Sequence, residues 1–329
     1  ADLEATYLVG KVKAKVHPFV EYFKFLKQFE DEQTVAKYTI PAPAQMYQQM
    51  IVPQNIEQTR KFYATDDELI EDIGKAYQDV IKQFYSAGCR NLQLDDCTWG
   101  AIVGDAAKQR YQSLGVDIEE VKARLLKVNN LALENRPEDM VITSHICRGN
   151  YHSTFFTSGP YDSVADYVFA QEHVDALLLE YDDERSGGFA PLAKVSPDKK
   201  VVLGLITTKK PELEDKDKVI ARIHEAAKYI PLDRLCLSPQ CGFASCEIGN
   251  KLTEEQQNIL TEAAKEACEF GLNATKDGSD ANFAALEGAG LEVVDTDVDS
   301  LKAKINYNAY ACAKTDVGKQ ILTSMGVAL

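Results

Sequence analysis

The sequence predicts an α/β protein built on a parallel sheet, and two observations support this fold class. Apolar, β-rich runs alternate with helix-like segments about six times between residues 36 and 239. The strand-like runs are apolar throughout, which is typical of parallel strands covered on both faces. This pattern is compatible with a closed barrel and with an open doubly wound sheet. No G-x-G-x-x-G motif follows the first strand, which weakens a dinucleotide-binding interpretation.

The predicted strands share a continuous apolar character and end at polar residues or turns. They are 36–40 (AKYTI), 91–96 (NLQLDD), 140–147 (MVITSHIC), 174–181 (VDALLLEY), 200–207 (KVVLGLIT) and 234–239 (RLCLSP). The predicted helices have apolar residues at three- and four-residue spacing. They cover 66–88, 118–135, 161–172 and 215–230.

Length and charge set the broad class. The 329 residues, of which 45% are hydrophobic, are enough for one large core. The sequence changes character near residue 252, so we expect one domain over 1–252 and a mostly helical segment over 253–329. A net charge of −15 argues against nucleic acid or an anionic membrane as the main partner. With no run of 18 apolar residues and no signal-peptide pattern, a cytoplasmic protein without membrane spans is expected.

Candidate functional residues follow the ends of several predicted strands. They are Asp95, Asp96, His145, Cys147, Glu180 and Cys241. Ligands of parallel α/β folds bind at this carboxyl edge of the sheet. Because side chains alternate along a strand, His145 and Cys147 are expected to point into one site.

Imidazole, thiolate and carboxylate groups are the ligands of tetrahedral zinc. Together, His145, Cys147, Glu180 and Cys241 would supply one nitrogen, two sulfurs and one oxygen. Zinc would keep a thiol substrate ionised near neutral pH and therefore nucleophilic. The alternative interpretation of the H-x-C pair is a core histidine beside a buried thiol.

Other polar and aromatic residues near these ends have two interpretations each. Asp96 either contacts substrate or orients the start of a helix. Trp99 and Tyr151 either stack on a flat substrate ring or pack in the core. The charged loop 182–185 is either a solvated loop or a substrate contact beside Glu180.

Four motifs in order, LQLDD, TSHICRGNYHS, LLLEYDDERSGG and LSPQCGFAS, resemble the catalytic domain of cobalamin-independent methionine synthase. The short, single-barrel branch is the most similar, over about residues 5 to 252. The resemblance implies a (β/α)8 TIM barrel of the methionine synthase/uroporphyrinogen decarboxylase type. It also implies Zn²⁺ bound by His145, Cys147, Glu180 and Cys241, with Asp95 holding the amino group of homocysteine.

The implied reaction is zinc-dependent methyl transfer to the thiol of homocysteine, as part of methionine biosynthesis. Asp95 and Glu180 would be its catalytic residues, and Asp95, Asp96, Trp99 and Tyr151 would contact substrate. The implied donor is a methyl-folate. The family's D-x-H-S motif is replaced here by LGLITTKKPE, with Thr207, Thr208 and Lys209 at the corresponding positions, which leaves the donor open.

Two further departures keep other functions open. The family's G-S-F and G-E-F motifs are absent, so the first two strands of the barrel are expected to be missing from this chain. Residues 253–329 resemble the C-terminal part of TRAP-type solute-binding proteins. The alternatives are therefore a zinc-dependent alkyl transferase that uses another thiol, such as coenzyme M, and a non-catalytic small-molecule binding protein. The oligomeric state stays open.

Overall fold

The computed structural model describes residues 6–31 and 34–242. The chain divides into two units, Ala1–Thr253 and Glu254–Leu329, and every described residue belongs to the first. The segment 253–329 lies outside the described residues, so its predicted helical character stays a prediction. No helix in the described ranges is long and apolar enough to cross a membrane.

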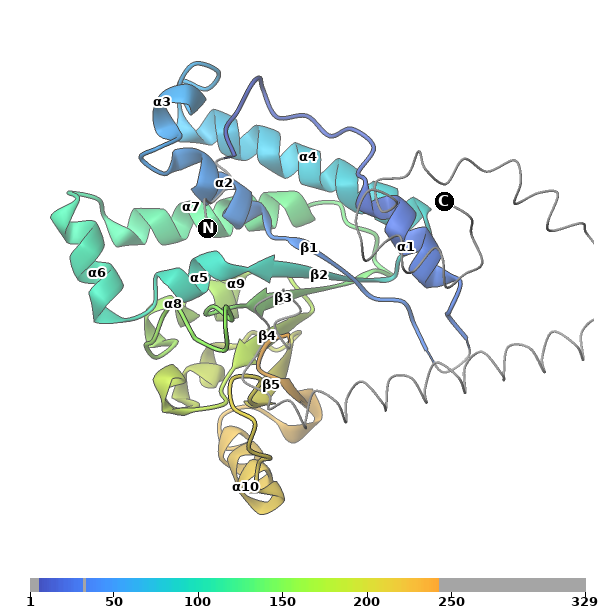
Figure 1. Cartoon of the computed structure of the whole chain (residues 1–329), viewed down its shortest axis with the longest axis vertical. Helices are drawn as coiled ribbons and strands as arrows, with labels where there is room; N and C mark the ends of the chain where they lie inside the picture. Colours follow the sequence, from blue (N-terminus) through green and yellow to red (C-terminus); the bar gives the residue numbers. More distant parts are fainter. Residues whose placement is uncertain (1–5, 32–33, 243–329) are drawn as a thin grey trace, which may run out of the picture. The chain divides into compact units, whose positions relative to one another are not determined.

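Six parallel strands form one sheet in chain order (Figure 1). They are β1 (Tyr38–Pro41), β2 (Asn91–Asp96), β3 (Val141–Ile146), β4 (Ala176–Glu180), β5 (Lys200–Ile206) and β6 (Leu235–Pro239). The predicted α/β class and the six strands are thereby confirmed. Among the described residues, β1 and β6 each pair with one neighbour only, so the sheet is not seen to close into a barrel.

Helix α1 precedes β1, and the other described helices lie between successive strands in the sequence. They are α1 (Phe19–Lys27), α2 (Pro43–Ile51), α3 (Ile56–Thr59), α4 (Asp66–Ser86), α5 (Cys97–Ala101), α6 (Gly104–Ser113), α7 (Ile118–Leu133), α8 (Asp162–Ala165), α9 (Val168–Gln171) and α10 (Lys216–Ala226). Short 3-10 turns are η1 (Glu184–Ser186), η2 (Ala190–Lys194) and η3 (Leu232–Arg234). In Figure 1, α2, α4 and α7 form a layer beside β1 and β2, and they contact one another.

The long helices begin where the sequence provides a cap. Thr65 precedes α4, and its side chain accepts a hydrogen bond from the backbone N–H of Glu68. Asp117 caps α7 in the same way, through the backbone N–H of Glu119. Both helices bury an apolar stripe, which supplies most of the stability of helices in folded proteins.

The predicted single helix over 161–172 is wrong, because the structure has two four-residue helices, α8 and α9, there. The break falls at Asp166 and Tyr167. The Asp166 carboxylate pairs with Lys194 at 2.7 Å, and the Tyr167 hydroxyl donates to Glu119 at 3.0 Å. These tertiary contacts accompany the break, and a periodic apolar pattern alone does not reveal them.

Side-chain alternation separates the two faces of the sheet. Leu92 and Ile142 are paired in register on a fully buried apolar face. Asp95 and His145 are paired on the opposite face. His145 is in turn paired with Leu178, and Glu180 lies two residues further along β4. Because residues two apart share a face, Asp95, His145 and Glu180 face the same side at the carboxyl edge.

Candidate metal centre

Four side chains from three strand ends meet at the carboxyl edge of the sheet. They are His145 in β3, Cys147 directly after β3, Glu180 at the end of β4 and Cys241 two residues after β6. One ligand atom from each residue lies within 4.8 Å of the ligand atoms of the other three. The structure therefore brings together the four residues that the sequence singled out, and these groups could hold a metal ion.

The spacing and burial of the donor atoms suit a tetrahedral metal site. The two sulfur atoms, of Cys147 and Cys241, are 3.8 Å apart. Two thiolates bound to one zinc at about 2.3 Å in tetrahedral geometry would be about 3.8 Å apart. His145 Nε2 is buried and has no hydrogen-bond partner in the described part of the chain. Because buried polar atoms are almost always paired, this nitrogen is a candidate ligand atom.

The thiols are neutral without a cation. A hydrogen bond from Cys241 lowers the pKa of Cys147, but Cys97 and burial outweigh it and raise that pKa to about 12. Hydrogen bonding to Cys147 and burial also raise the pKa of Cys241. A divalent cation bound by Cys147 and Cys241 would favour their thiolate forms, because metal binding deprotonates coordinating thiols.

Glu180 is fully buried, and both of its carboxylate oxygens accept hydrogen bonds. The backbone N–H of Arg148 donates to Oε1 at 2.7 Å, and the Arg185 guanidinium donates to Oε2 at 2.7 Å. The hydroxyl of Tyr161 accepts from the backbone N–H of Glu180 at 3.0 Å. These contacts fix the carboxylate orientation, as groups that surround metal ligands commonly do.

Arg185 joins Glu180 to the charged loop 182–185. Its guanidinium donates to Asp182 Oδ1 at 2.6 Å and also contacts the Asp183 carboxylate. The side chains of Arg185 and Asp182 are 4% and 1% exposed. The solvated-loop interpretation is therefore wrong for these two residues, because their charges are paired and buried. The sequence patterns did not predict the role of Arg185, although Arg185 lies only five residues after Glu180.

The predicted substrate-contacting residues differ in accessibility. Asp95 is half-buried and lies beside His145 in register, and Tyr151 is 60% exposed after β3. Asp96 and Trp99 are fully buried. Asp96 caps α5 by accepting from the backbone N–H of Thr98 at 2.8 Å. We therefore expect Asp96 and Trp99 to support the site rather than contact a ligand.

Sequence reasoning also missed a buried carboxyl pair behind the strand ends. The Asn129 amide donates to Asp96 Oδ2 at 2.8 Å and to Glu172 Oε1 at 3.3 Å. Burial and the neighbouring charge of Asp96 raise the pKa of Glu172 to about 8. Both carboxyls accept from the same amide, and burial favours the neutral form of Glu172.

We expect Glu172→Gln to gain stability relative to the wild type as the pH rises. The pKa of Glu172 is higher in the folded protein than in the unfolded chain. The contribution of Glu172 to stability is therefore complete below about pH 4.5 and is lost progressively as the pH rises to about 8. The difference in free energy of unfolding between variant and wild type should grow by at least about 1 kcal/mol over this window. Urea unfolding at pH 5 and pH 8.5 measures it, with exposed Glu57→Gln as the control. A difference that does not change with pH would contradict the assignment.

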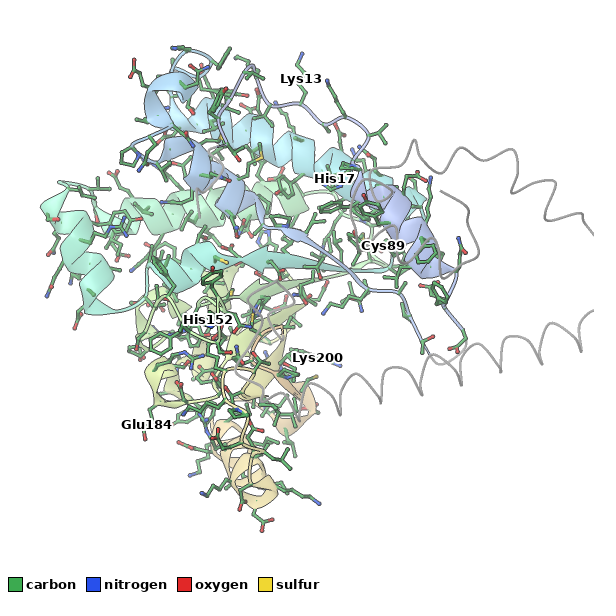
Figure 2. All side chains as sticks on the ribbon, viewed as in Figure 1. Lys13, His17, Cys89, His152, Glu184 and Lys200 are labelled. Carbon is green, nitrogen blue, oxygen red and sulfur yellow. The ribbon has the colours of Figure 1, made fainter. Side chains whose placement is uncertain are left out.

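The remaining described thiols lie apart from this cluster or at its rim. Cys89 precedes β2 at the amino end of the sheet, whereas His152 lies in the loop after β3 (Figure 2). Cys89 is buried, and its thiol donates to Asn91 O at 3.4 Å. Cys97, at the start of α5, is exposed.

Comparison with known proteins identifies the family. Residues 57–266 match the family described as "Cobalamin-independent synthase, Catalytic domain". The chain therefore belongs to the catalytic-domain family of cobalamin-independent methionine synthase, as its four motifs indicated.

Individual relatives are similar to this chain over most of its length. The chain is 45% identical over 251 residues to "Uncharacterized protein YxjH" of Bacillus subtilis, and the match covers 76% of this chain and 65% of that protein. It thus spans just under two thirds of that relative's length. A structure described as a "Putative Vitamin-B12 Independent Methionine Synthase" from Listeria monocytogenes is 34% identical, with a TM-score of 0.59 over 80% of this chain and 73% of that one.

A more distant structure supports the fold alone. It is a B12-independent methionine synthase from Shewanella sp. W3-18-1, in complex with selenomethionine. It is 20% identical, with a TM-score of 0.54, and the match covers 81% of this chain and 71% of that one.

Proposed function

We propose that this chain binds zinc through His145, Cys147, Glu180 and Cys241 and methylates the thiol of homocysteine to form methionine. The observation that supports this most directly is the convergence of the four ligand atoms within 4.8 Å of one another. Family membership supports methyl transfer. When bound, zinc would favour the thiolate form of the acceptor.

The chain's own residues would position the acceptor. Asp95 lies beside His145 in register, so its carboxylate could pair with the ammonium group of homocysteine while the sulfur approaches the ligand cluster. Glu180 is held rigidly by Arg185 and by the backbone of Arg148. Such fixed orientation of reacting groups can supply several kcal/mol of the barrier reduction. Exposed Tyr151 is available to stack on a flat donor such as the pterin of a methyl-folate.

The same proposal includes a (β/α)8 barrel and a reducing location. The unpaired edges of β1 and β6 among the described residues suit further strands. The described cysteines are all free thiols, as a compartment such as the cytoplasm favours.

The test is product formation by zinc-loaded protein. Homocysteine with 5-methyltetrahydrofolate triglutamate should yield methionine, measured by mass spectrometry, and Cys241→Ser should abolish the product. Methylation of coenzyme M in place of homocysteine would favour the alternative transferase. Tight binding of either thiol without any methylated product would contradict the transferase and favour a binding protein.

A further inference from the structure

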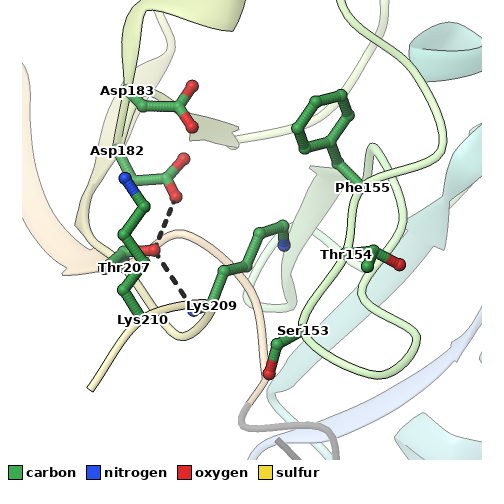
Figure 3. A pocket seen from close by; sticks show the side chains of 8 residues that line it. All are labelled: Ser153, Thr154, Phe155, Asp182, Asp183, Thr207, Lys209 and Lys210. Atoms are coloured by element: carbon green, nitrogen blue, oxygen red, sulfur yellow. Dashed lines mark hydrogen bonds between the residues drawn. The ribbon is translucent and has the colours of Figure 1, made fainter. Parts of the chain in front are cut away.

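A pocket of about 380 Å³ lies beside the metal centre, over the ends of β4 and β5 (Figure 3). Its lining residues come from the loops after β3, β4 and β5. They are Ser153, Thr154, Phe155, Asp182, Asp183, Thr207, Lys209 and Lys210. Asp182 joins the pocket to the centre, because Arg185 binds both Asp182 and Glu180. A donor molecule in this pocket would therefore sit next to the acceptor site.

Lys209 is held in the pocket by a hydrogen bond to the loop after β3, which is itself bound to the loop after β6. It is 5% exposed, and its ammonium group donates to Asn150 Oδ1 at 3.1 Å. The amide of Asn150 donates in turn to Thr208 Oγ1 at 3.3 Å and to the backbone carbonyl of Gly242, next to Cys241. In Figure 3 the Lys209 side chain extends across the pocket toward the loop that contains Ser153, Thr154 and Phe155. The ammonium group is thus held between the loops that contain Cys147 and Cys241.

The acidic and hydroxyl groups of the pocket are engaged elsewhere. Asp182 accepts from Arg185 through Oδ1 and from the Thr207 hydroxyl through Oδ2 at 2.9 Å. Asp183 accepts from the backbone N–H of Arg185 at 2.9 Å. An ammonium group has three N–H donors, and the one acceptor of Lys209 among the described residues is Asn150. Lys209 therefore keeps donor capacity that a ligand could use.

The proposed reaction needs a proton on the donor side if the methyl group leaves from nitrogen. A neutral tertiary amine does not release an amide anion near neutral pH, so its nitrogen must gain a proton as the methyl group departs. The S–C bond forms from the acceptor thiolate, the N–CH3 bond breaks, and an N–H bond forms. The proton comes from an ammonium group, which becomes a neutral amine and regains its proton from water.

We propose that Lys209 is a catalytic residue that donates this proton to the leaving nitrogen of a methylated amine bound in the pocket. The inference rests on the proposed function, and it adds the residue that acts on the donor.

The test compares two donors whose leaving groups differ in their need for a proton. Zinc-loaded wild type, Lys209→Met, Lys209→Arg and the exposed control Lys218→Met are given homocysteine with 5-methyltetrahydrofolate triglutamate or with methyl iodide. Iodide leaves without a proton, so after subtraction of the uncatalysed reaction Lys209→Met should methylate homocysteine from methyl iodide within about twofold of the wild-type rate. Its kcat with the folate should fall by about 100-fold, in the range of general acid catalysis. Folate affinity, measured by calorimetry, should change less than about threefold, and Lys209→Arg should recover part of the rate.

The other outcomes would contradict the role of Lys209, the class of the donor or the proposed function. Folate turnover by Lys209→Met within threefold of wild type would overturn the inference, and so would a loss fully explained by weaker folate binding. Wild-type protein that accepts methyl iodide but not the folate would contradict a methylated-amine donor while leaving thiol activation intact. Wild-type protein that gives no product from the folate and no acceleration over the uncatalysed reaction with methyl iodide would instead contradict the proposed function itself.

Discussion

Replacing Arg185 by leucine is expected to lower the free energy of unfolding by about 3–5 kcal/mol, because breaking a buried ion pair leaves uncompensated charge. Arg185 is the cation that pairs with Glu180 and Asp182, whose side chains are 0% and 1% exposed. Without it, both carboxylates would be buried with fewer donors. The change should also weaken metal affinity by about 10- to 100-fold, as loss of a group that orients a metal ligand typically does.

Urea unfolding of the metal-free protein measures the first effect, and competition with a zinc chelator measures the second. The matched control is Lys75→Met, which removes an exposed ion pair with Glu71 whose partners are 62% and 60% exposed. That variant should stay within about 0.5 kcal/mol of the wild type. If Arg185→Leu does not fold, Arg185→Lys keeps the charge without the planar fork and should show a smaller loss. A change below 1 kcal/mol in Arg185→Leu would contradict the role assigned to the buried ion pair.

Replacing Gly100 by alanine is expected to destabilise the protein by about 1–3 kcal/mol, the usual cost of forcing atoms into a well-packed interior. A Cβ at Gly100 would lie 2.1 Å from the carbonyl oxygen of Cys147. Backbone must therefore move on one side or the other, either in α5 or at the end of β3. Because Cys147 is one of the four candidate ligands, metal affinity should fall together with stability.

Gly188→Ala is the control for this variant, because no atom lies within 4 Å of a Cβ built at Gly188. It should leave both the unfolding midpoint and the zinc affinity unchanged. If Gly100→Ala has the same unfolding midpoint and the same zinc affinity as the wild type, the close contact between α5 and the Cys147 backbone is not important for either property.

The strands and the ligand cluster were predictable because their signals are local in the sequence. The H-x-C spacing places His145 and Cys147 on one side of the β3 end. Chain order places Glu180 at the end of the adjacent strand β4, and Cys241 after β6, two strands further along the sheet. Parallel strands bring such ends to one edge of the sheet. Four short motifs were therefore enough to indicate both the family and the cluster.

The supporting contacts were not predictable, because they join residues that are far apart in the sequence. Asn129 reaches Asp96 across 33 residues and Glu172 across 43. No periodic pattern specifies such a pairing, and a polar residue within a helix is normally interpreted as exposed. The break between α8 and α9 is likewise accompanied by long-range contacts, since Lys194 and Glu119 bind the residues at the break from distant segments.

Zinc content is the measurement that tests the central claim most directly. Wild-type protein and Cys241→Ser would be purified under reducing conditions, loaded with zinc, dialysed against a weak chelator and analysed for metal per chain. The account predicts about one zinc per wild-type chain, as expected for a site with four protein ligands, and little in the variant. Wild-type protein that is folded and fully reduced but retains no zinc would contradict the claim that His145, Cys147, Glu180 and Cys241 form a metal centre.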